Sequence, residues 1–204
     1  MSIHSWRTQS LRRLLLIAAL LHITLAIAIT VVGKTRLLPN TFDSNGVGIS
    51  FALDSVSYRE QAVYMAQMLR EGRLREWIDY RAKLATLHAR IYSVLYALLG
   101  WLLGEGILAI EPVNLFCYLA MLSLVYVIGA AVFSPTIGRL GAIAIGLWPS
   151  LLMFTTQLLR DPMYICCFLL LVWILIVCIK GLASWKHVAT YTSTGLVALT
   201  LVLL

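Results

Sequence analysis

The sequence predicts an all-α polytopic membrane protein with about five transmembrane helices. Of the 204 residues, 61% are hydrophobic and only 12% are charged. A soluble domain is about 45–50% apolar and about 25% charged. Several apolar runs also approach the roughly 20 residues that cross a hydrocarbon core. These observations exclude an ordinary soluble enzyme, a disordered protein and a free nucleic-acid-binding protein.

The predicted spans cover residues 14–32, 113–133, 137–154, 163–179 and 188–204. The first span follows Arg7, Arg12 and Arg13, and it continues through Val32. That length favours a retained signal anchor over a cleaved signal peptide. The last span stops at Leu204 without a polar tail, so we expect a truncated single membrane domain.

A sixth apolar run, residues 91–103, is shorter than a span, so we predict an interfacial segment over 89–103. The long first loop is left out of the following comparison. If this run does not cross the membrane, six Lys and Arg residues lie on the cytoplasmic side and only Arg160 lies on the outer side. The positive-inside rule favours that arrangement, which also puts all nine acidic residues outside. We therefore expect an integral protein of a bacterial inner (plasma) membrane, with a cytoplasmic N-terminus and an outer loop over 33–112.

The net charge of +7 is interpreted as an orientation signal. The basic residues lie mostly beside apolar runs, which indicates contact with membrane lipids and no nucleic-acid partner. The sequence contains no Gly-rich phosphate loop, H-E-x-x-H or Cys-x-x-Cys motif. The four cysteines are Cys117, Cys166, Cys167 and Cys178, and all lie in apolar runs. They are interpreted as small hydrophobic residues, so no metal site is predicted.

Within the outer loop, residues 55–70 are predicted to form an amphipathic helix. Tyr58, Ala62 and Met65 share one face at helical spacing, and Gly72 follows as a stop signal. Such a helix lies flat on the membrane or packs against the spanning helices, and both interpretations stay open.

Asp54 stands just before this helix and has two interpretations. An Asp in this position caps a helix by accepting backbone N–H bonds from the first turn. Ser57 and Glu60 form an S-x-x-E capping box that is able to take that role instead. Asp54 is then free to act as a general base towards a hydroxyl group.

Two further groups of polar residues flank apolar runs. His88 and Arg90 precede the interfacial segment, where they contact lipid headgroups or bind a lipid-linked phosphate, since an Arg fork matches phosphate oxygens. Arg160 and Asp161 lie between two predicted spans. They either pair or face water, with Asp161 capping the helix that Pro162 begins, or Arg160 binds a substrate phosphate.

Three polar residues elsewhere are given structural interpretations. His22 lies in the first span and is predicted to bond to a neighbouring helix. Glu105 and Glu111 are isolated acids in a short connector and are predicted to be solvated.

The order of several short motifs along the chain is informative. They are Asp54-x-x-x-Tyr58-x-x-x-Ala62, His88 with Tyr92 and Tyr96, Leu147-Trp148-Pro149, and Leu159-Arg160-Asp161-Pro162. This order resembles the N-terminal part of the polyprenyl-phosphate-dependent membrane glycosyltransferases. Those proteins have the GT-C fold and include protein mannosyltransferases and aminoarabinose transferases. The family's second acid is replaced here by Ser55, and the two prolines of its His-led segment are missing.

The resemblance implies transfer of a sugar, with inversion, from a polyprenyl-phosphate donor to a hydroxyl group of a glycan, lipid or protein at the outer face. It implies that Asp54 is the catalytic base. The substrate-binding residues it implies are Tyr58, His88, Arg90, Arg160 and Asp161. No cofactor is expected beyond the donor substrate, and dependence on a divalent metal stays open. The alternative is a non-catalytic scaffold or assembly subunit with a membrane-protein partner.

Overall fold

The computed structural model describes residues 3–43, 48–50, 53–80, 87–180 and 193. Within these residues the regular structure is helical, apart from an isolated antiparallel bridge between Phe42 and Ile49. This confirms the predicted all-α class. The helices are α1 (Ile3–Lys34), α2 (Leu53–Arg70), α3 (Leu74–Asp79), α4 (Leu87–Leu103), α5 (Ile107–Val132), α6 (Pro135–Gly146), α7 (Pro149–Thr155) and α8 (Asp161–Ile179).

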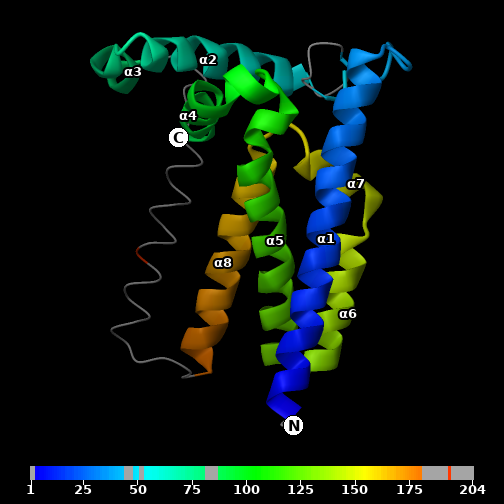
Figure 1. Cartoon of the computed structure of the whole chain (residues 1–204). Coiled ribbons are helices and arrows are strands. Elements are labelled where there is room, and N and C mark those ends of the chain that lie inside the picture. Colours follow the sequence, from blue (N-terminus) through cyan, green and yellow to red (C-terminus); the bar gives the residue numbers. More distant parts are fainter. Residues whose placement is uncertain (1–2, 44–47, 51–52, 81–86, 181–192, 194–204) are drawn as a thin grey trace.

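Several helices form a bundle, and other helices lie across one end of it. Helices α1, α5, α6 and α8 run roughly side by side, whereas α2, α3 and α4 lie across their top (Figure 1). We call α2–α4 the cap and the end that they cover the cap end. The opposite, basal end holds the N-terminus, the α5–α6 connection and the last turn of α8 (Figure 1).

Charge is divided between the two ends. The nine acidic residues lie in the cap, in the segments beside it, in the second turn of α5 or in the first turn of α8. Arg12 and Arg13 lie in the early turns of α1, Arg139 lies near the start of α6, and Lys180 follows α8 at the basal end. The Lys180 ammonium group donates to the Ala131 carbonyl group, joining the ends of α8 and α5. The acidic residues are therefore confined to the cap half of the molecule, whereas basic residues lie at both ends.

In the described part of the chain, three helices are long and apolar enough to cross a membrane: Leu11–Lys34 within α1, all of α5 and all of α8. The bent pair of α6 and α7 makes a fourth span if it is counted as one. The predicted spans over 14–32 and 163–179 fall within α1 and α8. The predicted span over 188–204 lies outside the described residues, apart from residue 193.

The prediction of one continuous helix over 137–154 is wrong. Helices α6 and α7 are separate and bent by 66° relative to each other. The break falls at Leu147 and Trp148, and Trp148 is extended, with φ −70° and ψ 112°. Pro149 explains it, because a proline ring disfavours helical geometry in the preceding residue and removes a helical N–H donor.

Other boundaries also shift. Helix α5 begins at Ile107, six residues before the predicted span over 113–133, so it includes Glu111 and Pro112. The predicted helix over 55–70 and the predicted segment over 89–103 correspond to α2 and α4, each starting two residues earlier. The proposed capping box is therefore wrong, because Ser57 lies inside α2 rather than before it.

The apolar face of α2 packs on α4. Ala62 and Ala66 on α2 and Tyr92 and Tyr96 on α4 are fully buried and belong to one core cluster. Small alanine side chains let the two helices approach closely enough for the tyrosine rings to fill the space between them. The same core cluster continues into the first turn of α5 through Ile107. The cap is therefore joined to the bundle through α4.

We expect Gly138→Ala to destabilise the hairpin of α5 and α6. A Cβ atom at residue 138 would meet the Tyr126 carbonyl oxygen and would lie 2.7 Å from the Ala130 nitrogen, so backbone must shift. Overpacking of this kind costs about 1–3 kcal/mol. Gly141→Ala is the matched control, because its nearest neighbour is a Val125 methyl group at 3.4 Å. Thermal unfolding in detergent should show a lower midpoint for Gly138→Ala alone, and equal midpoints would contradict the close helix approach.

Candidate functional site

The segment between α7 and α8, residues 156–160, is held in place by hydrogen bonds from distant parts of the chain. The Tyr92 hydroxyl group donates to the Leu159 carbonyl group at 2.9 Å. The Asn114 side-chain amide donates to the Gln157 carbonyl group at 2.9 Å. The Gln157 side-chain oxygen in turn accepts the Ile49 backbone N–H at 2.8 Å. Arg160 is therefore the last residue of a segment that is fixed to α4 and α5.

Three aromatic rings of the cap stand next to this segment. The Tyr58 ring meets the His88 ring edge to face, with 4.4 Å between centroids. His88 and Tyr92 are arranged in the same way at 5.8 Å. All three side chains are buried. Since Tyr92 also holds Leu159, the row of rings connects α2 to the segment that carries Arg160.

Charged groups surround the Tyr58 hydroxyl group. Burial raises the pKa of Tyr58, the Arg160 guanidinium group lowers it, and the Asp54 and Asp161 carboxylates raise it. These three charged residues therefore lie within electrostatic reach of one phenol group, and all three are exposed. The fold thus gathers five of the six predicted site residues, and we call them the cap-end cluster: Asp54, Tyr58, His88, Arg160 and Asp161.

His88 is the buried base of the cluster. Burial, with a smaller contribution from the Arg160 charge, lowers the pKa of His88 from 6.5 to about 4. The imidazole ring is therefore neutral at neutral pH. A neutral ring offers one N–H donor and one acceptor nitrogen, which suits hydrogen bonding to hydroxyl groups.

Helix starts position the two carboxylates. Asp54 lies in the first turn of α2, and Asp161 is the first residue of α8. The N-cap of α8 is Arg160, without a side-chain cap bond, so the prediction that Asp161 caps this helix is wrong. Both acids instead lie in first turns, where the helix dipole favours negative charge.

Arg90 has a different role from the other predicted residues. Its guanidinium group lies over the Trp77 ring, 5.1 Å from the centroid. It donates to the carbonyl groups of Trp77, Ile78 and Tyr80 at 2.7, 3.2 and 3.0 Å. These are the carbonyl groups at the C-terminal end of α3. The donors of Arg90 therefore hold α3 against α4.

An apolar cavity of about 670 Å³ lies between α5, the α6–α7 break and α8. Its apolar wall includes Met121, Val125, Phe154 and Leu169, and Asp161 and Tyr164 also line it. Asp161 therefore belongs to both the cavity and the cap-end cluster. The arrangement suits an amphiphilic ligand, with a polar group beside Arg160 and an apolar chain inside the bundle.

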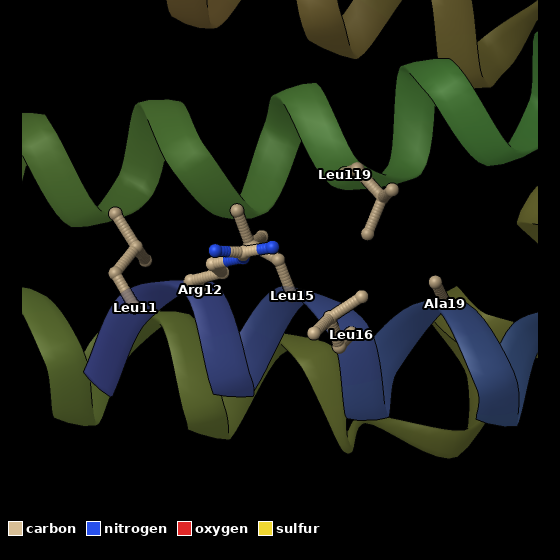
Figure 2. Close-up of a pocket in the computed structure, with 6 residues that line it drawn as sticks. All are labelled: Leu11, Arg12, Leu15, Leu16, Ala19 and Leu119. Carbon is tan, nitrogen blue, oxygen red and sulfur yellow. The ribbon is translucent and has the colours of Figure 1, made fainter. Parts of the chain in front are cut away.

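A smaller cavity of about 330 Å³ lies near the basal end, between α1 and α5. Figure 2 shows the Arg12 guanidinium group lying along this groove, among leucine side chains of α1 and Leu119 of α5. An arginine beside leucines at the end of a span is typical of contact with a lipid headgroup. This groove is therefore interpreted as lipid-facing surface.

No family model, curated protein or solved structure matches the chain. The resemblance to membrane glycosyltransferases therefore stays a prediction from the ordered motifs. The cap-end cluster and the cavity supply the chemistry from which a function is inferred.

A second polar group lies inside the bundle, and sequence reasoning found only part of it. His22 bonds to neighbouring helices as predicted, through Glu111 at 2.7 Å and Thr155 at 3.1 Å. The prediction that Glu111 is solvated is wrong, because it is buried and paired with His22. Glu105 is partly exposed and pairs with Arg70 at 2.8 Å. The available signal for Glu111 was its place just before an apolar run, at Pro112, with Asn114 one turn later.

We expect His88 to make the protein less stable as the pH falls from about 7 to about 5. The pKa of His88 is 6.5 in an unfolded chain and about 4 in the folded protein. Below pH 6.5, His88 binds a proton in the unfolded state but stays neutral in the folded state. Lowering the pH from 7 to 5 therefore reduces the free energy of unfolding by roughly 2 kcal/mol. His88→Gln should flatten this part of the stability profile, measured by unfolding in detergent. An unchanged profile in the variant would contradict a neutral buried His88.

Proposed function

We propose that this chain binds a polyprenyl-phosphate-linked sugar and transfers the sugar to a hydroxyl acceptor. The observation that carries the proposal is the meeting of the cap-end cluster with the apolar cavity at Asp161. A lipid-linked sugar phosphate needs both parts, a cationic polar site and an apolar groove at the same membrane depth. The ordered motifs of the sequence support the same class of substrate.

Donor binding divides between the two parts of the site. The isoprenoid chain would occupy the cavity, where Phe154 and Leu169 supply apolar contacts. Arg160 would donate to the phosphate oxygens, since a guanidinium fork matches their geometry. Asp161 would accept hydrogen bonds from sugar hydroxyl groups.

The transfer is a single displacement at the anomeric carbon of the sugar. The acceptor oxygen forms a bond to this carbon while the bond to the phosphate oxygen breaks, so the configuration inverts. Asp54 takes the proton of the acceptor hydroxyl group as general base. Arg160 stabilises the charge that grows on the departing phosphate, and Tyr58, within electrostatic reach of both residues, would position the acceptor.

We also propose that the cap end faces the outside of a bacterial plasma membrane and that the N-terminus is cytoplasmic. The basic residues at the basal end support this orientation through the positive-inside rule. The cap would rest in the outer interface. Leu98, Trp101 and Leu102 support that placement, because they leave α4 with an exposed apolar face and Trp101 is 80% exposed.

Replacing Asp54 by Asn should lower the rate of sugar transfer from polyprenyl-phosphate donors by about 10²- to 10⁴-fold, because the general base is lost. Donor binding should be retained. Glu60→Gln is the matched control, since it removes another exposed carboxylate of α2 and should transfer at the wild-type rate. Transfer by Asp54→Asn at the wild-type rate would exclude Asp54 as the base. Donor binding without transfer in the wild-type chain would instead support a non-catalytic role.

Replacing Arg160 by Gln should weaken binding of a polyprenyl phosphate by about 10- to 100-fold, because a charge-assisted hydrogen bond is lost. Arg75→Gln is the matched control, since the Arg75 side chain is 96% exposed on α3. Binding to protein in lipid nanodiscs, followed with a fluorescent donor analogue, measures the difference. Equal affinities for the two variants would remove Arg160 from the phosphate site.

Cysteine labelling in intact cells tests the orientation. In a background without the native cysteines, Glu71→Cys at the cap end should react with a membrane-impermeant maleimide. Lys180→Cys at the basal end should react only after the membrane is opened. Labelling of Lys180→Cys from outside would reverse the proposed orientation.

A further inference from the structure

The groove between α1 and α5 lies towards the basal end of the bundle, apart from the cap-end cluster. It encloses a volume of about 330 Å³. The residues that line it on α1 recur at helical spacing and form one face of that helix, opposite a single residue of α5: Leu11, Arg12, Leu15, Leu16 and Ala19 on α1, and Leu119 on α5. From Arg12 to Ala19 this face extends about 10 Å along the helix axis. The groove is therefore apolar, with a single charged residue near its basal end.

Arg12 makes no polar contact within the chain. Its side chain is exposed, and no residue that the structure describes forms a hydrogen bond or an ion pair with it. Figure 2 shows its guanidinium group between the two helices, beside the leucine side chains of the groove. The nine acidic residues all lie in the cap half of the molecule, so no carboxylate of the chain neutralises it. The N–H donors of Arg12 are therefore available to an anion from outside the chain.

Other basic residues lie at the same end of the bundle. Arg13 follows Arg12, Arg139 lies near the start of α6, and Lys180 follows α8. Each Lys or Arg near a membrane surface adds about 1 kcal/mol of attraction to anionic lipids. A zwitterionic headgroup would bring its own cation among these basic groups, and the acidic residues that pair with a cation lie in the cap half. The charge at this end therefore favours an anionic phospholipid over a zwitterionic one.

We propose that the groove between α1 and α5 is a binding site for one anionic phospholipid. The lipid phosphate accepts hydrogen bonds from the Arg12 guanidinium group, whose fork matches phosphate oxygens. One acyl chain lies in the hollow against Leu15 and Leu119. General contact of the bundle with bilayer lipids needs neither a hollow nor an unpaired arginine at its end. The site is separate from the proposed sugar transfer and does not depend on it.

The test is native mass spectrometry of the purified, delipidated protein in detergent. The protein is titrated with an equimolar mixture of phosphatidylglycerol and phosphatidylcholine that carry acyl chains of different isotopic mass but equal length. We expect saturable binding of one phosphatidylglycerol per chain, about tenfold tighter than binding of phosphatidylcholine, because one charge-assisted contact distinguishes the two lipids. Equal affinities of the wild-type protein for the two lipids would overturn the proposal.

Two arginine variants separate the site from the general charge of this end. Arg12→Gln should weaken phosphatidylglycerol binding by about tenfold, because the phosphate loses its charged donor. Arg13→Gln is the matched control, since Arg13 is an exposed neighbour of the same charge that is not part of the groove lining. It should bind the lipid like the wild type. Equal affinities of the two variants would indicate diffuse attraction to the basal charge and would overturn the proposal.

A second pair of variants tests the acyl-chain part of the site. Ala19→Trp fills the groove without changing its charge and should also weaken phosphatidylglycerol binding by about tenfold, because the chain loses its buried apolar contacts. Leu20→Trp is the matched control, since Leu20 is 67% exposed on the same helix outside the groove. Binding by Ala19→Trp at the affinity of Leu20→Trp would exclude the groove. The wild-type protein and the arginine variants decide the proposal even if Ala19→Trp fails to fold.

Discussion

The break between α6 and α7 leaves backbone carbonyl groups that need hydrogen-bond donors. The rest of this structure depends on which side chains supply those donors. The apolar interior supplies no water to the carbonyl groups that a break sets free. Tyr118 donates to the Gly146 carbonyl group at 2.6 Å, where α6 ends. Asn114 and Tyr92 donate to the Gln157 and Leu159 carbonyl groups, each at 2.9 Å. Three side chains from α4 and α5 thus stabilise the path from α6 to α8.

That repaired path creates both features from which function is inferred. The apolar cavity lies beside the bend between α6 and α7, and α5 and α8 form its other walls. The short segment after α7 then brings Arg160 to the cap, within electrostatic reach of Tyr58 and His88. Asn114 serves two places at once: its nitrogen supports this segment, and its oxygen lies in the interior polar group. The two polar centres therefore share a structural connection.

Much of the candidate site was predictable, because its residues stand at boundaries between apolar and polar sequence. Asp54 opens an amphipathic helix and Arg160 separates two apolar runs, so both were selected from pattern alone. Arg90 met the same criterion, yet its donors are used by the carbonyl groups that end α3. A sequence pattern locates a charged side chain at an interface. Which acceptor it reaches depends on the neighbouring helix.

The sequence by itself determined that this is a membrane protein, which segments form apolar helices and where the charged residues lie along the chain. Each of these depends on composition and local periodicity. Only the tertiary structure decided that α6 and α7 meet at a bend of 66° and that the released backbone groups find partners. It also decided the burial of Glu111, whose partner His22 lies 89 residues earlier. From the sequence, a carboxylate next to an apolar run is expected to be solvated. Burial of Glu111 is favourable only because the fold places His22 beside it, since a carboxylate in an apolar interior needs a partner.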